Sequence, residues 1–161
     1  MRIRKVNLQD FPELRRIYRA AREFMRTHGN PNQWGNTSPE EELLLKDIRG
    51  GNLYLVLDDG GHPAGAFALF TEPDPTYSYI ERGSWLSATP YTTIHSIASD
   101  GTAHGVLRMA VDFAEGVYRH VRIDTHEDNI VMQTALEKLG FSRRGIIYLA
   151  NGDPRIAYEK I

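Results

Sequence analysis

Apolar residues recur at two different periods along this chain, and the changes of period divide it into predicted helices and strands. Positions 11, 14, 18, 21 and 25 are apolar at helical spacing, which predicts a helix from Phe11 to the glycine at 29. A second helix is predicted to begin with Ser38 as its N-cap and Pro39 as its first residue. This helix ends near Arg49, before two glycines.

Short apolar runs bounded by turn residues predict strands outside these helices. The predicted strands are residues 1–6, 53–57, 64–71, 143–149 and 154–160. The sequence Asp58-Asp59-Gly60-Gly61 joins the second and third of these strands as a hairpin. Asn151-Gly152 predicts a hairpin with a type I′ turn between the last two strands.

The stretch from Thr92 to Phe141 organises the rest of the chain, because it reads as strand, glycine-bearing turn, helix, strand and helix. Two strands joined through a helix are expected to be parallel neighbours, whereas the hairpins elsewhere give antiparallel pairs. The full order is β-α-α-β-β-β-α-β-α-β-β. It predicts a single α/β domain over residues 1–161 with a mixed, mostly antiparallel sheet.

Composition excludes several classes of protein. The chain has 161 residues with 41% apolar and 25% charged positions, as is ordinary for a globular domain. The net charge of −2 gives no general basic surface for nucleic acid, and no apolar run approaches the ~18 residues needed to cross a bilayer. Because there is no cysteine, disulfides, thiolate metal sites and a cysteine nucleophile are excluded. A cytoplasmic location is expected.

The turn around Gly105 is a candidate anion site. It leads directly into a predicted helix, where unpaired backbone N–H groups and the positive end of the helix dipole favour phosphate. A glycine there lets a ligand approach the backbone closely.

The residues from Ile123 to Phe141 read I-D-T-H-E-D-N-I-V-M-Q-T-A-L-E-K-L-G-F, in which Asn129 is followed eleven and twelve residues later by Gly140 and Phe141. This pattern resembles the strand-five and helix-four motif of the GNAT superfamily of N-acetyltransferases. I-H-S-I-A-S at 94–99 resembles the fourth strand of that family, and the C-terminal hairpin resembles that of small bacterial members. The resemblance extends over nearly the whole chain.

The resemblance implies a GNAT-like fold with about seven strands and about four flanking helices, and acetyl-CoA as co-substrate without a metal. The cofactor would lie in a wedge between strands four and five, with its pantetheine along strand four and its pyrophosphate on the turn. The implied cofactor-binding residues are Ile97, Ala98, Ser99, His104, Gly105, Val106, Leu107, Arg108 and Asn129.

Two departures from the family pattern bear on this expectation. The turn begins with Thr102 where the family has Gln or Arg, and has Leu107 where the family has Gly or Ala; Arg108 is a candidate to replace the lost charge. Leu136 stands where many members carry the tyrosine that protonates the departing thiolate. Leu136 is predicted instead to contact Phe141 in a Schellman cap.

Acetyl transfer to an amine needs a base, and His95 is the first candidate because imidazole titrates in the useful range. His126 is a weaker candidate, and Tyr148 could replace the missing tyrosine. The alternative is that His95 is a half-buried strand histidine, that His126 caps a helix and that Tyr148 packs on its strand. The candidate substrate-binding residues, which alternatively anchor long loops on the sheet, are Gln33, Trp34, Tyr79, Glu81 and Trp85.

The sequence therefore predicts an acetyl-CoA-dependent N-acetyltransferase that acts by direct transfer to a primary amine of a small molecule or peptide. The alternative is a non-catalytic acyl-CoA-binding or sensing domain with the same fold. No nucleic acid or membrane partner is expected, and a homodimer is one candidate assembly.

Overall fold

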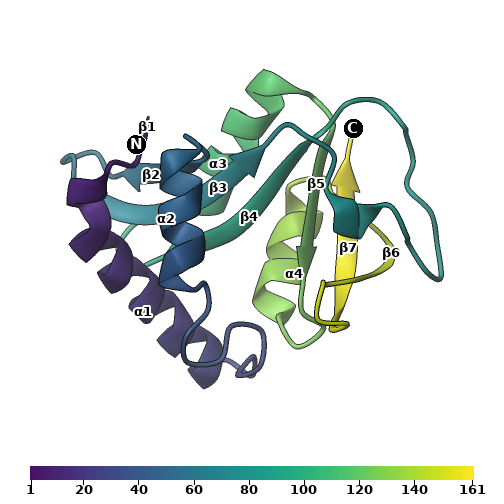
Figure 1. Ribbon diagram of the computed structural model, residues 1–161, viewed down its shortest axis with the longest axis horizontal. Helices are drawn as coiled ribbons and strands as arrows, with labels where there is room; N and C mark the ends of the chain where they lie inside the picture. The colour runs from purple at the N-terminus through teal and green to yellow at the C-terminus, as the bar shows by residue number, and fades with distance from the viewer.

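The computed structural model describes all residues from 1 to 161 and shows one α/β unit built on a seven-stranded sheet (Figure 1). The strand order is β1-β2-β3-β4-β5-β7-β6. The strands are β1 (Arg2–Lys5), β2 (Leu53–Leu57), β3 (Pro63–Phe70), β4 (Thr92–Ser99), β5 (Val121–Thr125), β6 (Ser142–Tyr148) and β7 (Pro154–Lys160). The helices are α1 (Phe11–Thr27), α2 (Glu41–Arg49), α3 (Val106–Val117) and α4 (Ile130–Lys138), with 3-10 turns η1 (Leu8–Asp10) and η2 (Pro75–Tyr77).

The expected parallel pair is present, and it is short. β4 and β5 pair only through Thr92 with Val121 and Thr93 with Arg122, and every other strand pair is antiparallel. Beyond these residues the two strands diverge, which opens the middle of the sheet (Figure 1). The predicted mixed sheet is confirmed.

The helices cover both faces of the sheet (Figure 1). α1 and α2 pack their apolar side chains on β2, β3 and β4, and α3 and α4 cover the opposite face. None of the helices combines the length and apolarity that a membrane-crossing segment requires.

The long segment between β3 and β4, residues 71–91, covers β5, β6 and β7 on the face of the sheet where α1 and α2 lie. Its Glu81 forms a two-way backbone pair with Ile146 of β6, at N···O distances of 2.8 and 2.9 Å. Glu159 of β7, whose side chain is fully buried, accepts hydrogen bonds from Leu86 N and Arg122 Nε and contacts His120 Nε2. These contacts fasten the segment to β5, β6 and β7.

Two local predictions were wrong. The second helix begins at Glu41 rather than after a Ser38 cap, because the Ser38 N–H donates to Trp34 O in a turn that precedes the helix. The last hairpin does not have a type I′ turn. A type I′ turn needs a positive φ at both Asn151 and Gly152, but of these two residues only Gly152 has one, of 91°. The Gly152 N–H donates to Leu149 O, which is the geometry of a type I turn followed by a glycine bulge.

Candidate active site

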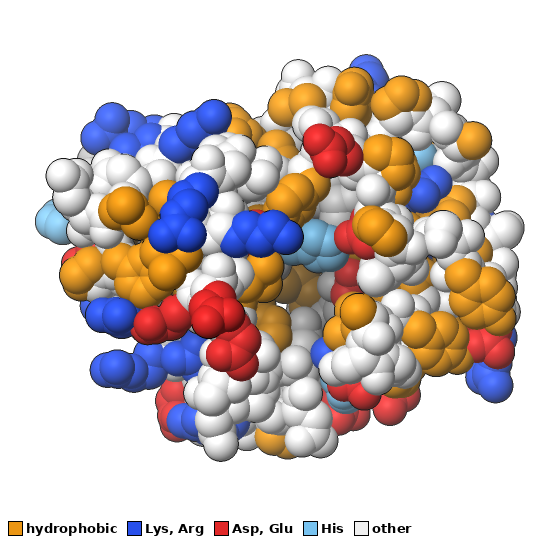
Figure 2. All heavy atoms as spheres, in the orientation of Figure 1, with side chains coloured by type: hydrophobic (Ala, Val, Ile, Leu, Met, Phe, Trp, Pro, Cys, Tyr) orange, Lys and Arg blue, Asp and Glu red, His pale blue; other side chains and the backbone are white.

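A cleft lies where β4 and β5 diverge, and it consists of two adjoining cavities. One has a volume of about 370 Å³ and the other of about 300 Å³. Met25, Ile97, Asn129 and Met132 line both, so the two cavities share a boundary. Figure 2 shows a hollow in the middle of this face with histidine and acidic side chains beside it.

An irregularity in β4 shapes the wall between the two cavities. Ser96 has a φ of 52°, and the pairing with β3 shifts between Ala66 and Ala68. The Tyr18 hydroxyl donates to Ser96 O at 2.7 Å, which fixes the bulged carbonyl toward α1. β-bulges commonly redirect the backbone beside functional sites. Since β5 has diverged from this point, residues 96–99 present a free backbone edge to the cleft.

The smaller cavity and the turn beyond it suit coenzyme A. Ile97, Ala98, Ser99 and Leu107 line the cavity, whose other walls are mostly apolar side chains of α1 and α4. Gly105 has a φ of 87° at the N-cap of α3, and the N–H groups of residues 104–106 have no acceptor in the protein. His104 and Arg108 are exposed beside this turn. An apolar trough that ends on free amides fits a pantetheine arm and a pyrophosphate.

His95 lines the larger cavity from β4 and is one-third exposed. Its Nε2 lies 2.6 Å from Oδ2 of Asp74, and the other oxygen of that carboxylate, Oδ1, accepts from the Thr76 N–H. Burial alone lowers the pKa of His95, but the Asp74 hydrogen bond and the negative charges of Asp124, Asp74 and Asp47 outweigh it and raise the pKa above its ordinary value. Burial acts against ionisation of Asp74, yet its bonds to His95 and Thr76 lower its pKa to about 2. Asp74 is therefore an ionised acceptor, and His95 carries its proton on Nε2.

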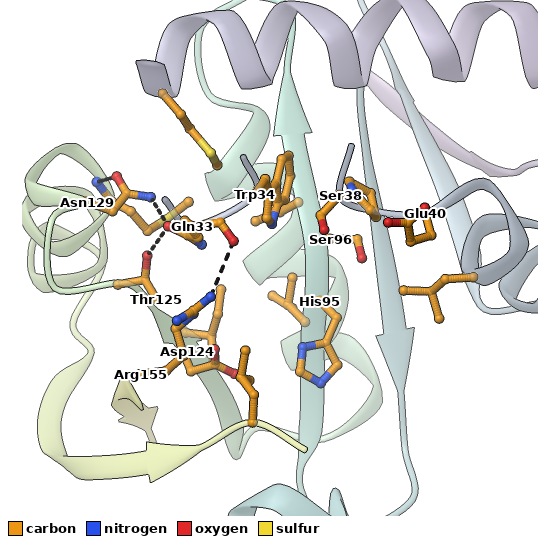
Figure 3. Close-up of a pocket in the computed structure, with 18 of the residues that line it drawn as sticks. Gln33, Trp34, Ser38, Glu40, His95, Ser96, Asp124, Thr125, Asn129 and Arg155 are labelled. Atoms are coloured by element: carbon orange, nitrogen blue, oxygen red, sulfur yellow. Dashed lines mark hydrogen bonds between the residues drawn. The ribbon is translucent and has the colours of Figure 1, made fainter. Parts of the chain in front are cut away.

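Asp124 lies on the opposite wall, on β5 (Figure 3). The hydroxyl of Tyr77 in η2 donates to Asp124 Oδ2 at 2.7 Å. Burial raises the pKa of Tyr77 well above its ordinary value, so this hydroxyl stays a donor. In Figure 3 one ring nitrogen of His95 faces the side of Asp124.

Asp47 of α2 also lines the larger cavity, and sequence reasoning missed it. It is only 4% exposed, and its carboxylate has no hydrogen bond or ion pair. Burial raises its pKa, against the opposing effect of His95 and Lys46. The signal was present: Asp47 follows Leu44 by three residues, so it falls on the buried face of the helix.

The α1–α2 loop crosses to the far side of the cleft through Gln33 (Figure 3). Gln33 Oε1 accepts from Asn129 Nδ2 at 3.0 Å and from Asn30 Nδ2 at 2.9 Å. Asn129 also caps α4 through its Oδ1, which accepts from the Met132 N–H. Trp34 stands beside Gln33 in the cavity, with its ring edge-on to Tyr18 at 5.7 Å.

The other candidate substrate residues do not line the larger cavity. The Trp85 indole N–H donates to Tyr77 O, and its ring packs on Arg122 at 4.0 Å, so it anchors the β3–β4 segment. Tyr79 is 63% exposed and stacks on Tyr148, whose hydroxyl donates to Glu81. Tyr79, Tyr148 and Glu81 thus form a separate group on the surface, because the β3–β4 segment runs outward along β6 instead of into the cleft.

His126 is placed like a capping residue. Its Nδ1 accepts from the Asp128 N–H at 3.0 Å, and it does not line either cavity. Leu136 is fully buried, as expected. Its carbonyl accepts from the Phe141 N–H at 3.0 Å, and Glu137 O accepts from the Gly140 N–H at 3.1 Å, which is the Schellman pattern. The predicted structural role of Leu136 is confirmed.

Arg155 is the second cavity residue that sequence reasoning missed. It lies on β7, is 7% exposed, and donates to Gln33 O at 3.3 Å and to Pro154 O at 2.8 Å. Alternation along β7 could place it on either face, so only the sheet order brought it to the cleft. No group of three or more His, Asp or Glu side chains is arranged to hold a metal ion.

Comparison with known proteins agrees with this geometry. Residues 1–142 match the acetyltransferase (GNAT) domain family. A solved GNAT-family acetyltransferase from Streptococcus agalactiae is 27% identical, with a TM-score of 0.81 over 99% of this chain and 94% of that one.

More distant structures show the same fold. A ribosomal-protein-alanine N-acetyltransferase from Brucella melitensis is 15% identical, with a TM-score of 0.64 over 100% of this chain and 99% of that one. A phosphinothricin acetyltransferase from Sinorhizobium meliloti, solved in complex with AcCoA, is 14% identical, with a TM-score of 0.61 over 99% and 86%. No curated protein matches the chain. The family match over most of the sequence and the parted strands of the sheet together establish that the chain belongs to the GNAT acetyltransferase family.

Proposed function

We propose that this protein is an acetyl-CoA-dependent N-acetyltransferase that transfers the acetyl group directly to a primary amine. The observation that carries the proposal is that the two cavities adjoin. The trough suited to coenzyme A shares four lining residues with the chamber that His95 lines. Three of the similar structures are named N-acetyltransferases, which supports an amine as the acceptor.

Residues of the chain would bind the phosphates, orient the acyl arm and accept a proton. Free amides at residues 104–106 bind the phosphates, and the free edge of β4 orients the acyl arm. Bound acetyl-CoA supplies a thioester whose acetyl carbon bonds to the amine nitrogen as the C–S bond breaks. Asp74 holds the Nε2 proton of His95, which leaves Nδ1 to take the proton that the amine nitrogen loses.

No side chain on the cofactor side is assigned as the acid for the departing thiolate, because Leu136 occupies the position of the usual tyrosine and is buried in the core. Positioning the amine against the thioester contributes ~7–11 kcal/mol by itself, so transfer does not depend on that acid. A second candidate function follows from the same observation: a domain that binds acyl-CoA as a sensor and has lost turnover.

Release of CoA with a panel of primary amines tests the proposal. We expect turnover in the wild type and a fall in kcat of about 10²- to 10⁴-fold in His95→Gln, with the acetyl-CoA Kd unchanged in calorimetry. His62→Gln is the matched control, because that side chain is 81% exposed on the β2–β3 turn. Acetyl-CoA binding without turnover for any amine indicates the sensor, and unaltered turnover in His95→Gln removes His95 from the mechanism.

A further inference from the structure

The guanidinium of Arg155 is a buried charge without a counter-ion in the protein. The side chain is 7% exposed and lines the larger cavity, and both of its hydrogen bonds go to backbone carbonyls. Figure 3 shows it on the β5–β7 wall, reaching toward Gln33. Its remaining N–H groups are available to a ligand.

Arg122 shows how this fold treats an arginine that serves structure alone. It is as buried as Arg155, at 6% exposed, but it pairs with Glu159 and lies over two aromatic rings, at 4.0 and 4.1 Å. Buried charges are costly unless they are paired. Arg155 has neither a carboxylate partner nor an aromatic ring beneath it, so no charged or aromatic group of the protein offsets the cost of burying its charge.

The opposite wall presents the complementary charge. The Asp47 carboxylate has no hydrogen-bond partner in the protein, and Asp47 lines the same cavity as His95 of β4. Its negative charge is one of those that raise the pKa of His95. An ammonium group is attracted to this wall, and Arg155 is the one lysine or arginine that lines the cavity. Asp124 also lies on the β5–β7 wall, where the Tyr77 hydroxyl donates to its carboxylate. An oxyanion is therefore attracted to Arg155 itself and not to that wall as a whole.

From this arrangement we propose that the acceptor is a small amino acid, meaning a primary amine that also carries a carboxylate, held by Arg155 through the carboxylate and by the Asp47–His95 wall through the amine. The inference rests on the proposed N-acetyltransferase function and narrows its substrate class. Arginine binds carboxylates through paired N–H groups with high geometric specificity. A cavity of about 370 Å³ suits a molecule of this size.

Matched acceptors test the proposal without any variant. CoA release is measured for the proteinogenic amino acids, β-alanine and γ-aminobutyrate, each against its carboxamide. We expect kcat/KM for the preferred acid to exceed that of its carboxamide by about 10- to 100-fold, the value of a charge-assisted hydrogen bond. Equal rates for acid and carboxamide overturn the inference and leave the N-acetyltransferase function intact.

Variants locate the effect. Arg155→Met is expected to lower kcat/KM for the acid to that of the carboxamide, and Arg155→Lys to recover part of the loss. Arg143→Met removes a positive charge from the exposed side of the same hairpin and is expected to keep the preference. An unchanged acid preference in both Arg155 variants, with acetyl-CoA affinity intact, contradicts the assignment. If Arg155→Met does not fold, the inference is still tested by Arg155→Lys and by the wild-type ratio of kcat/KM for the acid to kcat/KM for its carboxamide.

Calorimetry with the amino acids alone supplies a readout independent of turnover. Heat of binding that is present in the wild type and lost in Arg155→Met supports the site even if no amine is acetylated, which is the outcome that defeats the proposed function. Absence of heat for every amino acid, together with absence of acid preference, defeats the inference.

Discussion

Asp74 sets the protonation of His95 from a different element of the fold. Asp74 caps η2, and its carboxylate both orients the imidazole and raises its pKa. Burial would otherwise lower that pKa, so the pair decides at which pH His95 becomes neutral. The base at this site is thus tuned by a residue that lies 21 positions away in sequence.

Replacing Asp74 by Asn gives a prediction about pH. Because the substitution removes the carboxylate charge, the pKa of His95 falls, and neutral His95 then persists to lower pH. The acid limb of the kcat/KM profile is expected to shift to lower pH, and a less well oriented ring lowers the plateau. Glu72→Gln, at an exposed site in the same segment, is the control. An acid limb that stays in place in Asp74→Asn excludes His95 as the titrating base.

Asp47 and Arg155 show what single residues do not reveal in sequence. An acid in an amphipathic helix and an arginine in an edge hairpin are ordinary surface residues by composition. Helical spacing places Asp47 on the buried face of α2, but that neither side chain has a charged partner became visible only when α2 and β7 were both placed against the cleft. The sequence reasoning identified His95 for its chemistry alone, whereas its partner Asp74 lay in a segment without periodicity.

At the scale of elements, the β4–α3 turn is the proposed phosphate site, and Gly105 tests it. Gly105→Glu adds bulk and a negative charge beside the free amides, so acetyl-CoA binding is expected to be lost in calorimetry. Gly105→Asn is the matched variant, because Asn tolerates the positive φ of 87° and adds no charge. Asn is expected to retain binding with at most a modest loss. Intact binding in the Glu variant means that the phosphates lie elsewhere.

The end of α4 was predictable because a Schellman cap depends on residues close in sequence. Leu136 fills the core position that the cap creates, beside Phe141. Leu136→Tyr restores the family's residue type but inserts a larger side chain into a filled site. We expect unfolding free energy to fall by about 1–3 kcal/mol in urea titrations, with no gain in kcat. A stable variant with raised kcat contradicts the structural role of Leu136.

At the scale of the whole molecule, the buried Glu159 links β7 to the segment that carries Asp74. Its carboxylate accepts from the Leu86 N–H and from Arg122 Nε, and Arg122 Nη2 in turn donates to Ser87 O at 2.7 Å. Stability and the geometry of the active site therefore depend on one carboxylate far from the cofactor trough.

Glu159→Gln leaves the buried Arg122 without its counter-charge. The expected loss of unfolding free energy is about 3–5 kcal/mol in urea denaturation, accompanied by lower kcat because the segment that holds Asp74 loosens. The exposed Glu72→Gln is expected to change stability by less than about 0.5 kcal/mol. A Glu159 variant as stable as the wild type shows that other contacts hold the segment.

Features that depend on near neighbours in the chain were predictable from the amino-acid pattern. Apolar periodicity marked the helices and strands, the crossover from β4 to β5 required a parallel pair, and the Asn129–Gly140 spacing defined α4 with its cap. Local turn geometry was less secure, since the helix start at Ser38 and the type I′ turn were both wrong. Such details depend on one or two dihedral angles that several residues tolerate.

How distant segments meet became visible only in the folded chain. The insertion of β7 between β5 and β6 brought Arg155 to the cleft, and the outward path of the β3–β4 segment carried Tyr79, Glu81 and Trp85 away from it. The pairing of buried charges is a property of such long-range contacts, so no local pattern contains it. The fold was therefore predictable from periodicity, whereas the charge arrangement of the acceptor cavity was not.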